Sequence, residues 1–280
     1  MLFEPTAPIV VCSPHFDDAA LDCWTVLTQP GGCEVINVFA GVPGDGYSTW
    51  WDQLAGARSS AQMYRDRLKE DHAALALAGC TPRIVDFLDG QYRLRASRFL
   101  HALLVRVPKM RWRVQSIPIL RSWALISPPP TTSEIIAAMT VHVPAASLVC
   151  APAAIGRHPD HVLLRDAALE LARSGMPVRL YVDLPYGLRY GWPSWVSGAT
   201  PINDDAVNSL WRHDLDGAIE SLQSAVVEAL TPQQRIAKRA AVNCYQSQLS
   251  IEGSGFQELL QRDDGFDYEV HWPVPTGRIS

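Results

Sequence analysis

The chain has 280 residues, of which 48% are hydrophobic and 19% are charged, a balance typical of a folded globular protein. Its net charge of -5 provides no basic surface for nucleic acid, so we expect no nucleic-acid partner. We find no apolar run long enough to cross a bilayer and no signal-peptide pattern, and therefore expect no membrane span.

Six cysteines are scattered along the chain without a C-x-x-C pair. Several fall within predicted strands or helices, where a reduced cysteine packs as a small hydrophobic residue. Together with the missing secretion signal, this pattern predicts a reduced protein of the cytoplasm. The sequence makes no prediction of oligomeric state.

Short apolar runs alternate with helical patterns from the first residues onward. The predicted strands are rich in valine and isoleucine and cover residues 8–12, 34–40, 83–88, 147–151 and 178–184. Because these runs are continuously apolar, we expect the strands to be buried on both faces of a parallel sheet. Apolar residues at helical spacing predict helices over residues 57–78 and 161–173, with Gly79 and Gly175 near their ends. This alternation is typical of a doubly wound α/β sheet.

We expect one domain over residues 1–280, with two regions that depart from the α/β repeat. Residues 103–146 combine basic residues, tryptophans and the break Pro128–Pro130, which predicts a variable insertion or lid. Residues 186–280 are interpreted as a C-terminal elaboration, loop-rich at first and helical over about 214–249.

Polar clusters follow two of the predicted strands. The sequence SPHFDD, residues 13–18, comes directly after the first strand, and GRHPDH, residues 156–161, comes shortly after the fourth. In open α/β sheets, ligands bind outside the carboxyl ends of the strands. We therefore expect both clusters at the same edge of the sheet, although they are far apart in sequence.

The two clusters together contain the donors of a catalytic metal site. Zinc favours nitrogen and carboxylate ligands, and a catalytic zinc site has three protein ligands and one open position for water. His15, Asp18 and His161 would supply such a set. Asp17 is then free to take a proton from metal-activated water. As an imidazolium, His158 would stabilise a developing oxyanion and protonate a leaving amine.

Each cluster alone also has an ordinary structural interpretation. A His-x-x-Asp pattern near a strand end forms capped or hydrogen-bonded turns, because aspartate caps helices well. A His-Pro-Asp-His pattern is compatible with a loop and a capped helix. The occurrence of both after strands of one predicted sheet, with complementary ligand numbers, favours the metal site.

These motifs resemble those of the PIG-L/LmbE-like superfamily of metal-dependent N-deacetylases, of the N-acetylglucosaminyl deacetylase type. SPHFDDAALDC is similar to the first motif and RHPDH to the second. The resemblance continues through VFAGVP, the helix Arg67-x-x-Glu70-Asp71, the segment from Asp89 to Arg93, YVDLPYG and KRAAVNCYQSQL. It covers most of residues 8–250.

The resemblance implies a Rossmann-like (LmbE-like) fold, a single zinc ion and hydrolysis of an N-acyl group, commonly the N-acetyl group of an amino sugar. Fe²⁺ or another divalent metal would suit the same donors. By the same resemblance the metal ligands are His15, Asp18 and His161. Asp17 is then the general base, and His158 is the oxyanion or acid partner.

One position departs from the family pattern. Many members have a glutamate directly after the paired aspartates, where this chain has Ala19. Because neither the metal nor the water assignment uses this position, we expect changed packing around the site rather than lost activity.

Arg67 and Asp89 are predicted to bind the substrate. Arg67 resembles a position that contacts substrate in some relatives, and the alternative is a helix arginine paired with Glu70 or Asp71. Asp89, at a strand end, is expected to bind a sugar hydroxyl or to orient a ligand histidine.

Three further residues are predicted to support the site, namely Asp160, Lys238 and Tyr245. Lys238 and Tyr245 would share one face of a C-terminal helix at i and i+7. Docking of that helix on the core is favoured over direct catalysis. His271 is treated as structural or as a surface residue.

The sequence therefore predicts a zinc hydrolase that removes an N-acyl group from a small amino sugar or glycoconjugate. An amidase acting on a related thiol or natural-product conjugate is the alternative within this chemistry. A ligand-binding homologue without turnover is another, although the intact Asp17 and His158 argue against it. Non-haem Fe(II) oxygenases also use two histidines and one carboxylate, but they normally have β-rich folds.

Overall fold

The computed structural model describes residues 7–44, 48–93, 128–145, 147–199, 203–251 and 255–277. Residues 103–127, the larger part of the predicted insertion, lie outside these ranges. Among the described residues, no helix combines the length and the apolar character needed to span a membrane.

A seven-stranded sheet organises the described part of the chain, with the strand order β3-β2-β1-β4-β5-β7-β6. The parallel strands are β1 (Ile9–Ser13), β2 (Glu34–Asn37), β3 (Pro82–Ile84), β4 (Leu148–Pro152) and β5 (Val178–Tyr181). Antiparallel pairing adds β7 (Tyr268–Val274) and then β6 (Val226–Ala229) at one edge. The predicted mostly parallel α/β sheet is confirmed.

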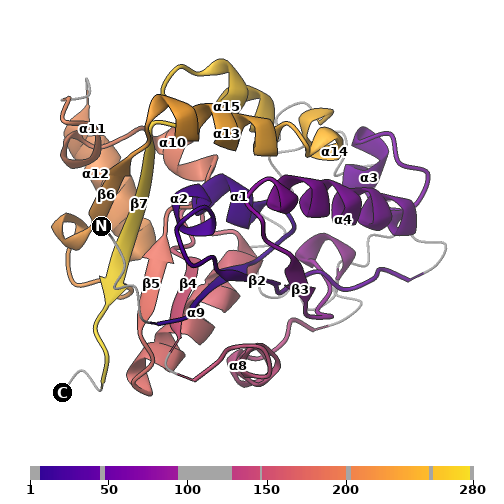
Figure 1. The fold of residues 1–280 in the computed structure, drawn as a ribbon, viewed down its shortest axis with the longest axis horizontal. Coiled ribbons are helices and arrows are strands. Elements are labelled where there is room, and N and C mark those ends of the chain that lie inside the picture. Colours follow the sequence, from indigo (N-terminus) through magenta and orange to yellow (C-terminus); the bar gives the residue numbers. More distant parts are fainter. Residues whose placement is uncertain are drawn as a thin grey trace.

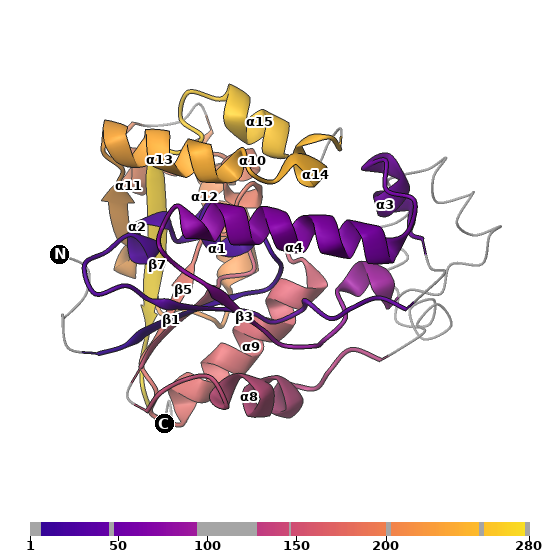
Figure 2. The same ribbon diagram turned by 45° about the vertical axis from the view of Figure 1, so that its right-hand side comes forward.

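Helices cover both faces of the sheet (Figure 1, Figure 2). On one face lie α1 (Asp18–Asp22), α2 (Trp24–Leu27) and α4 (Ser60–Ala76), with α13 (Pro232–Val242) packed against them. On the other face lie α8 (Thr132–Thr140) and α9 (Pro159–Arg173). Because both faces are covered, every residue of β1 is buried, which accounts for its continuous apolar run.

Short helices connect these elements and carry parts of the site. They are α3 (Trp50–Leu54), η1 (Gly90–Tyr92), α10 (Tyr186–Tyr190), α11 (Ser194–Ser197), α12 (Asp204–Leu215), η2 (Leu222–Ser224), α14 (Gln246–Leu249) and α15 (Phe256–Gln261). Of these, η1 and α10 follow β3 and β5, at the edge of the sheet where parallel strands end.

Helix boundaries differ from the predicted ones for local reasons. The helix predicted over residues 57–78 begins at Ser60, because the Ser59 side chain caps its first turn. Helix α9 begins earlier than predicted, with Pro159 in its first turn and His158 as its N-cap.

The predicted helical region over about 214–249 is wrong in its middle. Strand β6 interrupts it and pairs with β7, a strand that was not predicted. Helix α13 starts afresh after Thr231, which forms a capping box with Gln234 and precedes Pro232. Strand β6 has only four residues, too few for a sequence pattern to predict a strand. Its extended structure therefore depends on the pairing with β7.

Buried polar contacts attach the C-terminal helices to the core. Helix α13 ends at Val242, so Lys238 and Tyr245 do not share a face of one continuous helix, and that prediction is wrong. The Lys238 ammonium lies 2.6 Å from a Glu269 carboxylate oxygen, and the Tyr245 hydroxyl donates to Asp71 at 3.0 Å. Both side chains therefore tie their helices to the rest of the molecule.

Strand β7 buries a histidine that has no hydrogen-bond partner within the described residues. His271 is fully buried, and both of its ring nitrogens lack partners there. Burial, opposed by the Glu269 carboxylate and aided by the cations of Arg179 and Lys238, lowers the pKa of His271 to about 4. The folded protein therefore holds this imidazole neutral near neutral pH.

We expect His271 to reduce the stability of the fold as the pH falls. The unfolded chain protonates this imidazole near 6.5 and the folded protein only near a pKa of about 4, so stability is lost between these values. By linkage the loss is about 3 kcal/mol. Urea unfolding of the wild type and of His271→Leu, each at about pH 7 and about pH 4, measures this loss. Between the two pH values the free energy of unfolding should fall by about 3 kcal/mol more in the wild type than in the variant. A stability difference between the two proteins that does not change with pH would contradict the prediction.

Candidate metal-dependent active site

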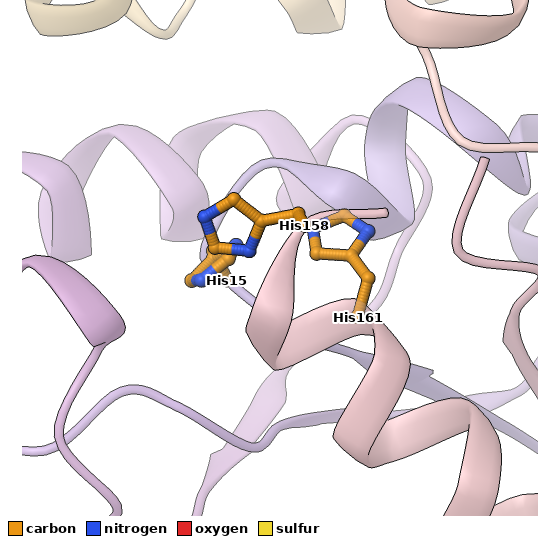
Figure 3. A group of neighbouring side chains, drawn as sticks. All are labelled: His15, His158 and His161. Atoms are coloured by element: carbon orange, nitrogen blue, oxygen red, sulfur yellow. The ribbon is translucent and has the colours of Figure 1, made fainter. Parts of the chain in front are cut away.

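The two polar clusters meet because β1 and β4 are neighbours in the sheet. His15 lies in the turn between β1 and α1, whereas His158 and His161 lie at the N-terminal end of α9. Figure 3 shows the three rings gathered at this point. The ring centre of His158 lies 5.0 Å from that of His15 and 5.1 Å from that of His161, and His15 and His161 are 5.2 Å apart.

The Asp18 carboxylate contacts both histidines that were predicted as metal ligands. Its Oδ2 is 3.3 Å from His15 Nδ1 and 3.5 Å from His161 Nε2. The same oxygen accepts a hydrogen bond from the His15 backbone N–H at 2.8 Å, which fixes the carboxylate in the turn. Such separations suit ligands of one small cation, since zinc–ligand bonds are about 2.0–2.3 Å long.

Two further carboxylates orient the histidine rings. His161 Nδ1 lies 2.5 Å from Asp183 Oδ1, and His15 Nε2 lies 3.1 Å from Asp160 Oδ2. Each ring thus uses one nitrogen for a carboxylate and turns the other towards Asp18. Metal-ligating histidines usually have this arrangement, because the carboxylate fixes the ring and makes the other nitrogen a better ligand. The donors present therefore fit a divalent metal.

Two combinations of donors among the described residues are close enough to hold a cation, and neither includes Asp18. They are His15, His158 and His161, and His15, Asp89 and Asp160, with ligand atoms within 4.8 Å of one another. The first would make His158 a ligand instead of a catalytic group. The predicted set of His15, Asp18 and His161 stays our proposal, because its two histidines point free nitrogens at a shared carboxylate.

Asp160 is fixed by the segment that follows β3. Its carboxylate accepts a hydrogen bond from the Gly90 backbone N–H at 2.8 Å and forms an ion pair with Arg93. Sequence reasoning assigned no role to Arg93 or to Asp183, although both lie in motifs of the family resemblance. Asp183 is a single charged residue shortly after β5, and Arg93 directly follows η1, so only the fold shows which histidine or carboxylate each contacts.

Arg67 links the predicted general base to Asp89. Its guanidinium lies 3.4 Å from Asp17 Oδ1 and 3.3 Å from Asp89 Oδ2, and all three side chains are buried. The alternative pairing with Glu70 or Asp71 is wrong, because these carboxylates bond to other groups of the core. The ion pairs hold Asp17 in one orientation beside the ligand cluster.

Burial and neighbouring charges set the protonation of the two candidate catalytic groups. Burial raises the pKa of Asp17, and the Arg67 guanidinium opposes this rise. Burial, together with the charges of the other two histidines, lowers the pKa of His158 to about 3. The ring is therefore neutral near neutral pH and not the imidazolium that was expected. Its Nδ1 accepts a hydrogen bond from the Asp160 backbone N–H at 3.4 Å, which leaves Nε2–H as a donor.

A pocket of about 250 Å³ opens onto these groups. The predicted site residues in its lining are His15, Asp17, Asp18, Arg67, Asp89, His158 and His161. The lining residues to which no site role was assigned are Leu21, Trp51, Gln91, Leu184, Pro185, Tyr186, Arg189, Gln248 and Phe256. Most of the second group are apolar or aromatic, and although several lie in motifs of the family resemblance, only the fold shows that they line this pocket.

The three predicted supporting residues do not line this pocket. Asp160 lies behind the pocket and contacts the lining residue His15. Lys238 and Tyr245 instead form the buried contacts that attach the C-terminal helices.

Similar proteins are deacetylases, although no protein-family model matches the chain. The 2'-N-acetylparomamine deacetylase of Niallia circulans is 27% identical over 206 residues, which are 62% of this chain and 66% of that protein. A deacetylase of the teicoplanin biosynthetic pathway, solved as a triple mutant, is 28% identical with a TM-score of 0.63, and the match covers 98% of this chain and 100% of that one. The deacetylase of the pseudoaglycone of the antimicrobial reagent A40926 is 27% identical with a TM-score of 0.62, and the match covers 98% of this chain and 99% of that one.

These similarities confirm the predicted resemblance to the PIG-L/LmbE-type N-deacetylases. The chain shares their α/β fold over nearly the whole length of both solved deacetylases, while it spans 66% of the length of the paromamine relative. The oxygenase alternative does not fit, because the observed sheet is mostly parallel and covered by helices.

His161→Ala and His158→Ala should separate the candidate ligand sets. His161→Ala removes a proposed ligand and should abolish metal binding. His158→Ala should still bind one equivalent, because the proposed set does not include this residue. Metal content after dialysis, measured by plasma mass spectrometry, checks both variants. Equal metal loss in the two would assign His158 to the ligands.

Asp183→Asn should weaken metal binding by about 10–100-fold while leaving every proposed ligand in place. Asparagine keeps the shape of the side chain but loses the charge that orients and polarises His161. Competition with a chelating indicator reports the affinity. Asp166→Asn, which changes a half-exposed carboxylate on α9, should bind metal like the wild type. Unchanged affinity in Asp183→Asn would show that this contact does not support the site.

Proposed function

We propose that the protein is a metal-dependent N-deacetylase that hydrolyses the N-acyl group of an amino sugar in a small glycoconjugate. The observation that carries this proposal is the position of Asp17 and His158 in one pocket with the oriented histidines and Asp18. This combination supplies a metal site, a base and a hydrogen-bond donor to a single bound substrate.

His15, Asp18 and His161 would hold the metal, for which zinc is the proposed identity and Fe²⁺ or another divalent ion the alternative. When bound, the ion would polarise the acyl carbonyl and make water more acidic. One structure of the teicoplanin deacetylase is of a zinc-inhibited form. We therefore expect the highest rate of amine release when no more than one zinc ion is supplied per chain.

Asp17 is the proposed general base. Its carboxylate is buried next to the ligand Asp18, and the contact with Arg67 fixes its orientation. The raised pKa of Asp17 brings it closer to neutral pH than an ordinary aspartate. A base in this range is better matched to taking a proton from water.

His158 is the proposed donor to the acyl oxygen as negative charge develops there. A neutral imidazole can do this from Nε2, because Nδ1 faces the Asp160 backbone N–H. The proton that Asp17 takes from water then passes from Asp17 to the leaving amine, while His158 keeps its Nε2 proton and donates a hydrogen bond.

The substrate class is inferred from the relatives and from the pocket lining. The similar proteins are a 2'-N-acetylparomamine deacetylase and a deacetylase of teicoplanin biosynthesis. The lining adds the apolar side chains of Trp51, Tyr186 and Phe256 to the charged groups. We propose an N-acylated amino sugar carried on a larger natural product, with a thiol conjugate as the alternative.

A panel of N-acylated amino sugars and glycoconjugates, assayed for freed primary amine, tests this function. We expect amine release by the zinc-loaded enzyme and a rate at least about 10²-fold lower in Asp17→Asn, because the general base is lost. Asp17→Asn should keep its metal. Asp66→Asn, at a partly exposed carboxylate of α4, is the matched control and should retain the full rate. Activity that survives complete chelation, or metal loss in Asp17→Asn, would contradict the proposed roles.

A further inference from the structure

Two cysteines face each other near the amino ends of β2 and β3, whereas the active-site residues follow the carboxyl ends of the strands. Cys33 Sγ lies 4.0 Å from Cys80 Sγ. Cys33 directly precedes β2, and Cys80 shortly precedes β3. The register pairs Val35 with Pro82, so its continuation towards the amino ends places Cys33 beside Cys80.

This pair has the geometry that a disulfide needs. Neighbouring strands lie about 4.8 Å apart, and disulfide-linked residues usually have Cα atoms about 4.4–6.8 Å apart. The sulfurs already contact each other, so side-chain rotation with a small adjustment of the backbone brings them to bonding distance.

The environment of the pair also favours reaction. Cys80 is buried, but Cys33, which contacts it, is partly exposed, so a small reagent reaches the pair from the side of Cys33. The hydrogen bond with Cys33 lowers the pKa of Cys80 to about 7. The same hydrogen bond, together with burial, raises the pKa of Cys33, and burial raises the pKa of Cys12, Cys23 and Cys150.

We propose that Cys33 and Cys80 are a modification site that forms a reversible disulfide with hydrogen peroxide as the oxidant. The Cys80 thiolate attacks one peroxide oxygen, so an S–O bond forms, the O–O bond breaks, and the departing hydroxide takes up the Cys80 proton as water. Cys33 then attacks Cys80 Sγ, so the S–S bond forms, the S–O bond breaks, and a second water carries away the Cys33 proton. The two thiols supply the two electrons that reduce peroxide, and a thiol reductant reverses the change.

The disulfide would stabilise the pairing of β3, the strand at one edge of the sheet, with β2. Strand β3 is an edge strand of three residues, and its Arg83 and Ile84 are exposed. Besides its pairing with β2, it is held by the exposed ion pair of Arg83 with Glu34. A bond between Cys33 and Cys80 closes a loop that contains α3 and α4, which restricts the unfolded chain. The pocket is not part of this contact, so its chemistry should be unchanged.

Peroxide treatment of the whole chain, followed by alkylation under denaturing conditions, tests the proposal. We expect two fewer alkylated thiols, a Cys33–Cys80 cross-linked peptide in a non-reduced digest, and a rise in Tm of about 5 °C or more. Dithiothreitol should reverse all three. Cys244→Ser, at the other partly exposed cysteine, should respond like the wild type, whereas Cys33→Ser and Cys33→Ala should show none of the three.

An unchanged thiol count, a cross-link between another pair, or a sulfinic acid on Cys80 without a cross-link would overturn the proposal. Mass spectrometry of the wild type detects the bond directly, so a poorly folding variant does not affect the result. The measurement also requires no substrate, so it is independent of the proposed deacetylase activity.

Discussion

The pairing of β1 with β4 is the constraint on which the candidate site depends. The register sets Ile9 beside Leu148 and continues along both strands, so their carboxyl ends meet at one edge of the sheet. The turns that follow bring His15, Asp18 and His161 together. Because the carboxyl ends of parallel strands all lie at the same edge of the sheet, two segments far apart in sequence become parts of one site.

Charge pairing allows the polar groups of this site to be buried together. An isolated buried charge is costly, and the charged side chains around the pocket have partners of opposite or complementary charge. Asp17 pairs with Arg67, Asp160 with Arg93, and Asp183 with His161. These outer pairs fix the inner donors, because each leaves a candidate catalytic carboxylate or a histidine nitrogen turned towards the pocket. Arg67, Arg93 and Asp183 therefore contribute to the geometry of the proposed site.

The C-terminal region completes the pocket. Strand β7 extends the sheet beside β5, and α13 and α14 pack against helices of the first half of the chain. Lys238 pairs with Glu269, which also accepts hydrogen bonds from the backbone N–H groups of Trp24 and Thr25. This docking allows residues of α14 and α15 to line the pocket beside those of α1 and α9. Substrate recognition is thus expected to draw on side chains distant in sequence from the proposed metal ligands.

The sequence by itself determined the features that depend on local pattern or on restricted chemistry. Continuous apolar runs predicted the parallel strands, because a strand covered on both faces must be apolar throughout. The two motifs also predicted candidate metal donors, because few side chains bind such an ion, and that assignment stays a prediction. The tertiary structure decided which groups are neighbours. It paired Arg67 with Asp17 and Asp89, placed Arg93 and Asp183 behind the site, and made a strand of β6. These outcomes depend on contacts between distant segments, which no local pattern in the chain encodes.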